Sequence, residues 1–120
     1  MPLEYKIEHG IVFIKNTGGA VTVQQQKAFT RRWLADPDLP TPLLVCRDYH
    51  GSFARTPAMM REFSQFWMSV VPNGTRAVLV VSGDLDFGMA KVFRGWAGSS
   101  GINVLRDRDE AIKWLRSGSR

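Results

Sequence analysis

The chain has 120 residues, of which 44% are hydrophobic and 22% are charged, and its formal net charge is +5. This length and composition are typical of one folded domain, and the single cysteine excludes an internal disulfide framework and a cysteine-rich zinc site. The basic residues are scattered and match no recognition-helix, RNP or zinc-finger pattern, so we expect no nucleic-acid partner.

The sequence shows neither a targeting signal nor a membrane-spanning segment. Residues 1–10 are charged and alternate in polarity, whereas a secretory signal contains an apolar stretch. The longest apolar run is far shorter than the roughly 20 residues that a helix needs to cross a membrane. We therefore expect a cytoplasmic protein without a membrane span.

The first two elements are predicted to be strands joined in a hairpin. Residues Leu3–Glu8 alternate between apolar and polar side chains, which is typical of a half-buried strand. His9 and Gly10 suit a turn. Residues 11–14 are all apolar, which indicates a second strand with a more central place in the sheet.

A helix is predicted over residues 22–34. Thr22 and Gln25 have the spacing of a capping box, in which two side chains satisfy backbone groups at a helix start. Phe29 and Trp33 then fall on one face of the helix. The Asp36–Pro37 dipeptide should end it, because the residue before proline is pushed away from helical geometry.

The middle of the chain predicts a strand, a polar loop and a second helix. The strand covers residues 43–47, and Cys46 within it is expected to be a small buried residue rather than a reactive thiol. The loop, residues 48–55, is the longest polar one and follows the carboxyl end of this strand. Thr56 and Pro57 are typical of a helix start, and that helix is expected to reach Val70.

The last third of the chain predicts strands and helices in alternation. An apolar strand at residues 76–81 is followed by a helical segment from Leu85, a strand at 102–105 and a closing helix at 107–115. The tight connections indicate a parallel pair of strands with a crossover helix. The full order, β-β-α-β-α-β-α-β-α, predicts an α/β domain with about five strands in a mixed sheet and about four helices.

Two segments of this region also resemble a known family. Residues 87–93 read FGMAKVF, and the closing helix contains DEAIKWL at residues 109–115. With the strand between them, these segments are similar to the SpoIIAA-like proteins, relatives of the STAS domain family. The resemblance implies one such domain over residues 1–116, followed by a tail at 117–120. It also implies a regulatory or ligand-binding fold without enzymatic activity.

The polar loop offers an alternative, hydrolytic function. Ser52 would be the nucleophile, His50 its base and Asp48 the group that orients the base. Three triad members within one short loop rarely face one another, and Ser52 lacks the G-x-S-x-G turn that exposes a nucleophile, which argues against this function. His9 and His50 are too separated for a metal site, so we predict neither a metal nor a cofactor.

A second alternative is a phosphorylation switch. Proteins of the SpoIIAA type carry a phosphorylatable serine at the start of the helix after this strand, and the nearest positions here are Thr56 and Ser52. Neither stands in the Asp-Ser-Ser-Gly-like context of that family. A phosphate at a helix N-terminus is electrostatically favourable, but Thr56 fits a plain N-cap better.

The leading interpretation is binding between the helix from Pro57 and the helix from Leu85. The occupant would be a partner protein, a second copy of the chain, or a small apolar or amphipathic molecule. Contact area would come from methionine and aromatic side chains: Met60, Phe63, Trp67, Phe87, Met89 and Phe93. Polar specificity would come from the loop: Asp48, His50, Ser52 and Arg55. An acidic headgroup would meet nearby arginines: Arg55, Arg61 and Arg94.

Overall fold

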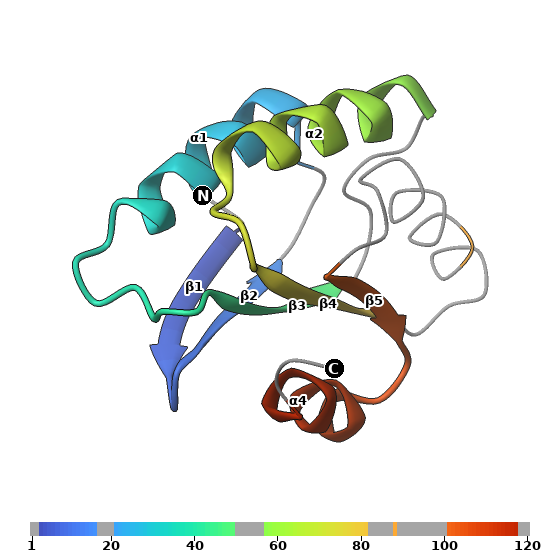
Figure 1. Ribbon diagram of the computed structural model, residues 1–120. Helices are drawn as coiled ribbons and strands as arrows, with labels where there is room; N and C mark the ends of the chain where they lie inside the picture. The colour runs from blue at the N-terminus through green and yellow to red at the C-terminus, as the bar shows by residue number, and fades with distance from the viewer. Residues whose placement is uncertain (1–2, 17–20, 50–56, 82–87, 89–100, 118–120) are drawn as a thin grey trace.

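Five strands form one mixed sheet in the computed structural model, which describes residues 3–16, 21–49, 57–81, 88 and 101–117 (Figure 1). The strands are β1 (Leu3–Glu8), β2 (Ile11–Asn16), β3 (Leu44–Tyr49), β4 (Arg76–Val81) and β5 (Ile102–Leu105). They lie side by side in chain order; β1 is antiparallel to β2, and every later pair is parallel. The predicted α/β class and the five-stranded mixed sheet are confirmed.

The hairpin of β1 and β2 forms as predicted. His9 and Gly10 make its turn, with φ angles of 53° and 78°, and Glu8 pairs with Ile11 beside it. β2 pairs with β1 on one side and with β3 on the other. This interior place explains why the first four residues of β2 are all apolar, whereas β1, at the edge, alternates.

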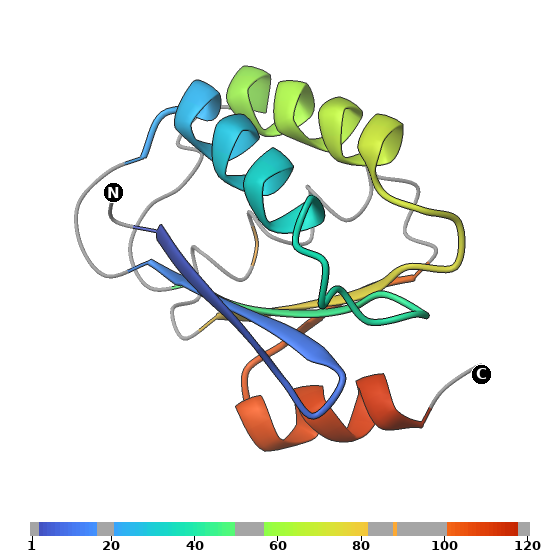
Figure 2. The same ribbon diagram turned by 90° about the vertical axis from the view of Figure 1, so that its left-hand side faces the viewer.

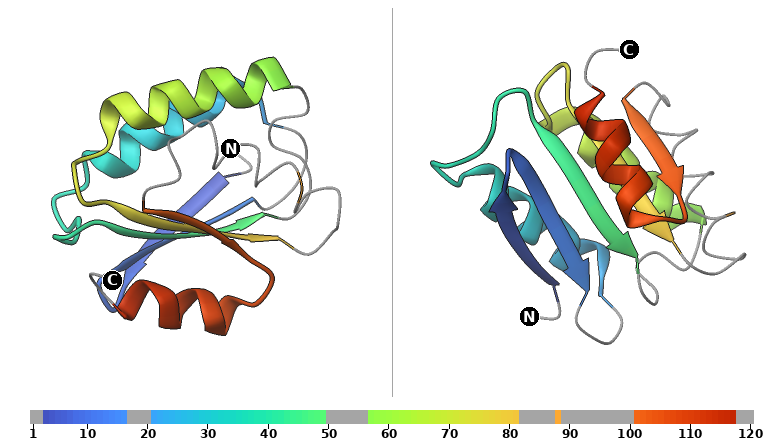
Figure 3. Two further views of the ribbon diagram at one scale, coloured as in Figure 1. Left: turned by 45° about the vertical axis from the view of Figure 1, so that its right-hand side comes forward. Right: turned by 90° about the horizontal axis from the view of Figure 1, so that it is seen from below.

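Three helices belong to the described part of the chain: α1 (Val23–Leu34), α2 (Pro57–Val70) and α4 (Arg108–Arg116). α1 and α2 cover one face of the sheet, and α4 lies on the other (Figures 1 and 2). α4 packs mainly against β3, β4 and β5, and leaves β1 uncovered on its face (Figure 3). Apart from Gly88, the predicted helix from Leu85 lies outside the described residues. None of the described helices has the length and apolar character needed to cross a membrane.

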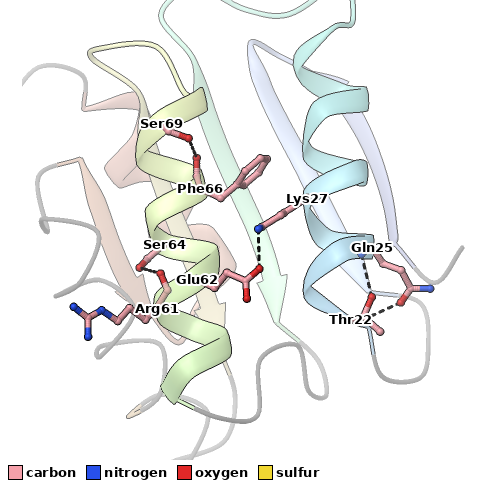
Figure 4. Close-up of polar contacts among 8 residues, drawn as sticks. All are labelled: Thr22, Gln25, Lys27, Arg61, Glu62, Ser64, Phe66 and Ser69. Carbon is pink, nitrogen blue, oxygen red and sulfur yellow. Dashed lines mark hydrogen bonds and ion pairs between the residues drawn. The ribbon is translucent and has the colours of Figure 1, made fainter.

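Local sequence signals define α1 (Figure 4). The Thr22 hydroxyl accepts a hydrogen bond from the Gln25 backbone N–H, and the Gln25 side chain accepts one from the Thr22 N–H, at 3.0 and 2.9 Å. This is the predicted capping box. α1 ends at Leu34, before Asp36. Lys27 of α1 pairs with Glu62 of α2 at 2.8 Å, which ties the two helices together (Figure 4).

The sheet separates two apolar layers. The larger lies under α1 and α2, where large aromatic side chains from both helices pack on the strands: Phe29, Trp33, Phe63, Phe66 and Trp67. The smaller lies under α4, where Ala111 and Leu115 meet Ile11, Cys46 and Val78. Both faces of the central strands are therefore buried, as expected for parallel strands.

The end of β3 differs from the prediction. Asp48 and Tyr49 were expected in the polar loop, but both belong to β3. The strand continues because it has neighbours on both sides: Asp48 pairs with Lys15 and Val80, and Tyr49 pairs with Val81. Backbone pairing on both sides thus overrides the polar side chain of Asp48.

Candidate functional site

The carboxyl edge of the sheet was predicted to carry the polar site residues. Asp48 is half-buried in β3 and faces α4, where its Oδ2 lies 3.8 Å from Nη1 of Arg108. The other predicted members lie outside the described residues: His50, Ser52, Arg55 and Thr56. The hydrolytic and phosphorylation alternatives therefore remain predictions.

A small hollow of about 170 Å³ lies beside Asp48, on the sheet face that α4 leaves uncovered. The Arg108 guanidinium lies over the Phe13 ring, 4.8 Å from its centre, and so lies close to both this ring and Asp48. One glutamate and two lysines of β1 and β2 also line the hollow: Glu4, Lys6 and Lys15. The lining of this hollow therefore carries charges of both signs.

Two polar side chains lie inside the apolar layer under α1 and α2. Arg47 of β3 is 7% exposed and Gln26 of α1 is 1% exposed. The Arg47 guanidinium donates a hydrogen bond to Gln26 Oε1 and lies 6.0 Å from the centre of the Phe63 ring. Gln26 Nε2 is buried without a hydrogen-bond partner. Our sequence analysis missed this pair, although Gln26 shares a helix face with Phe29 at a spacing of three residues.

The predicted contact residues of α2 are largely core residues. Phe63 is 2% exposed and Trp67 is 7% exposed. Their rings lie 6.4 Å apart, and the Trp67 ring lies 6.1 Å from that of Trp33. The Met60 side chain and the other predicted contacts lie outside the described part of the chain: Phe87, Met89 and Phe93. Of the described members, Trp67 also reaches a surface hollow.

That hollow lies at the amino ends of the parallel strands and has a volume of about 1130 Å³. We call it the amino-edge groove. The end of α2, the turn into β4, the starts of β4 and β5 and the end of α4 meet there (Figure 3). Apolar side chains dominate its lining: Pro42, Leu44, Trp67, Met68, Val71, Pro72, Ile102, Trp114 and Leu115. Met68 is 55% exposed, unlike the buried core residues beside it.

Arg76 is a charged residue of this groove whose guanidinium makes two contacts with Trp114. Its Nη2 donates a hydrogen bond to the Trp114 carbonyl oxygen at 3.0 Å, and its guanidinium lies 4.1 Å from the centre of the Trp114 ring. The first contact satisfies a carbonyl in the last turn of α4. The two contacts hold the guanidinium in one orientation. Arg116 also lines the groove.

The described residues do not provide a reactive thiol or a metal site. Cys46 is 1% exposed, and burial, with a smaller contribution from the charge of Asp48, raises the pKa of its thiol to about 11. The nucleophilic thiolate is thus disfavoured, as the sequence predicted. Among the described residues, no three histidine, cysteine or acidic side chains are grouped so that they could hold a metal ion.

No protein-family model matches this chain, and neither the curated proteins nor the solved structures contain a match.

Proposed function

We propose that this chain is a non-enzymatic binding protein of the SpoIIAA-like, STAS-related type, and that it holds a small apolar or amphipathic molecule in the amino-edge groove. The groove itself carries the proposal. Binding sites for small molecules are concave, mostly apolar and few in each protein. At about 1130 Å³ the groove is slightly larger than the roughly 300–1,000 Å³ of typical pockets, which suits a hollow open to solvent.

The exposure of Met68 supports this function. The side chain is 55% exposed at the end of α2, beside Trp67 and Val71. Burying a methionine side chain completely contributes about 1.5–3 kcal/mol, so a ligand that covers Met68 gains part of this free energy. A methionine side chain also adapts its shape to different apolar partners.

The first test is binding of N-phenyl-1-naphthylamine, an uncharged apolar dye whose fluorescence rises in apolar surroundings. We expect saturable binding to the wild-type chain. Met68→Glu places a charge in the groove and should weaken binding at least about fivefold, because covering a carboxylate costs desolvation energy. Gln65→Glu is the matched control: Gln65 is exposed on α2 and does not line the groove, so binding should not change.

Absence of saturable binding up to the solubility limit of the dye would refute the proposal, and so would equal weakening by both substitutions. Native mass spectrometry of freshly purified protein is the complementary measurement. A small molecule that is released on denaturation supports the proposal. A ligand-free dimer that Met68→Glu dissociates and Gln65→Glu does not would contradict it, because a second copy would then occupy the groove.

A further inference from the structure

The amino-edge groove is charged with one sign only. Its described lining contains two arginines, Arg76 and Arg116, and no aspartate or glutamate. Both arginines lie near the end of α4, whereas the side chains from α2 are apolar. The groove therefore combines an apolar wall with a positively charged end.

The charge of Arg76 has no counter-ion among the described residues, because no carboxylate there forms an ion pair with it. The Trp114 carbonyl accepts from Nη2, but Nη1 is buried without a hydrogen-bond partner. A buried donor without an acceptor destabilises the folded chain, and more so when the group is charged. An anionic oxygen placed next to Nη1 would remove this cost and neutralise the guanidinium.

We infer that the occupant of the amino-edge groove is a single molecule of an amphipathic carboxylate, which has one acidic head and an apolar chain. The head lies beside Arg76 and Arg116, and the chain runs along Trp67 and Met68. This inference rests on the binding function proposed above and adds the chemical class of the ligand. The half-buried Trp114 ring lies against the guanidinium, so binding of the head at the buried Nη1 requires this ring to shift.

Other occupants fit the groove less well. An uncharged amphiphile would cover the guanidinium and exclude water from it without providing a counter-ion, which is unfavourable. A cationic amphiphile would be repelled by both arginines, because the described lining holds no carboxylate to receive it. The charge of the groove therefore selects for an acid.

Displacement of N-phenyl-1-naphthylamine by ligands with one common chain tests the inference. The competitors are decanoate and decyltrimethylammonium, each below its micelle concentration, and decanol, below its solubility limit. A hydrogen bond to a charged group contributes about 1.5–3 kcal/mol, so decanoate should displace the dye at a concentration at least about tenfold lower than decanol. Decyltrimethylammonium should be the weakest. Decanoate, but not decanol, should also change the fluorescence of Trp114, measured as the signal lost in Trp114→Phe.

Two variants test whether the preference for decanoate over decanol comes from Arg76. Arg76→Met keeps an unbranched side chain but removes the guanidinium, and should bind decanoate no better than decanol. Arg61→Met removes the same charge from an exposed position of α2 outside the groove lining, and should retain the preference for decanoate. If Arg76→Met does not fold, the wild-type chain still tests the inference. The ratio of the decanoate and decanol concentrations that displace the dye is measured without any variant.

The outcomes separate this inference from the function on which it rests. If the dye binds but decanol competes as well as decanoate does, the groove binds apolar molecules and the inference is wrong. If Arg61→Met loses the preference as fully as Arg76→Met does, the selectivity comes from overall charge, which also overturns the inference. If the dye does not bind the wild type at all, the proposed function itself fails.

Discussion

Gly101 should be the glycine least tolerant of substitution among those with positive φ in the described chain. Its φ is +77°, and a Cβ added there would lie 2.4 Å from the Thr75 carbonyl oxygen. Its own carbonyl accepts a hydrogen bond from the Ala77 N–H at 2.6 Å, where β4 and β5 begin to pair. Alanine at this position must therefore push the start of β5 away from β4.

Gly74 provides the matched control, because its φ is +85° but nothing lies within 4 Å of an added Cβ. Gly74→Ala should lower the free energy of unfolding by about 1–2 kcal/mol, the cost of a side chain in left-handed backbone geometry. Gly101→Ala should lose a further 2 kcal/mol or so, from a weakened hydrogen bond of about 1 kcal/mol and from disturbed packing of the buried Ile102.

Urea unfolding followed by far-ultraviolet circular dichroism measures both values, provided that the slope m is the same for the variants and the wild type. The total stability of a domain of this kind is about 5–15 kcal/mol, so Gly101→Ala should still fold. Equal losses for the two variants, within about 0.5 kcal/mol, would refute the reasoning, because the contact with Thr75 would then have no energetic consequence.

Two further predictions concern Cys46 and the pair formed by Tyr5 and Asp36. Because Cys46 is buried and its thiol pKa is about 11, iodoacetamide at pH 8 should label it only when the chain unfolds in urea; rapid labelling of the native protein would contradict this. The Tyr5 hydroxyl donates to Asp36 Oδ2 at 2.6 Å, which holds the Asp36 pKa below its ordinary value of 3.8. The hydrogen bond therefore stabilises the folded chain at pH values above the ordinary pKa of Asp36. This stabilisation is lost as the pH falls through the lowered pKa. Tyr5→Phe should be less stable than the wild type at neutral pH, and the difference should shrink in acid; a difference that is constant with pH in urea unfolding would contradict it.

The parts of the fold that were predictable depend on neighbouring residues. α1 starts at Thr22 because the Thr22–Gln25 pair closes a capping box, and it ends before the Asp36–Pro37 dipeptide because of proline geometry. Both signals lie within a few residues of the helix end that they set. The end of β3 was mispredicted because its continuation to Tyr49 depends on pairing with β2 and β4, which are far away in the sequence.

The amino-edge groove could not be predicted for the same reason. Trp67, Arg76 and Trp114 belong to three elements, and only the packing of α2 and α4 against opposite faces of the sheet brings their ends together. The sequence patterns of α2 and α4 indicate apolar helix faces, but they do not show which side chains of those faces enter the core. Phe63 was expected at a ligand surface and is almost completely buried. The buried contact of Arg47 with Gln26 likewise joins a strand to a helix.

The two outer strands of the sheet bear on self-association. β1 is the edge next to the hairpin turn, and three of its six residues are charged and exposed: Glu4, Lys6 and Glu8. β5, at the opposite edge, has four residues and so offers few backbone groups for pairing. Charged side chains and short length are the devices by which proteins prevent sheets from joining edge to edge. These two edges therefore disfavour a continuous sheet that runs from one molecule to the next. Two copies of this chain would meet through faces of the domain rather than through edge strands.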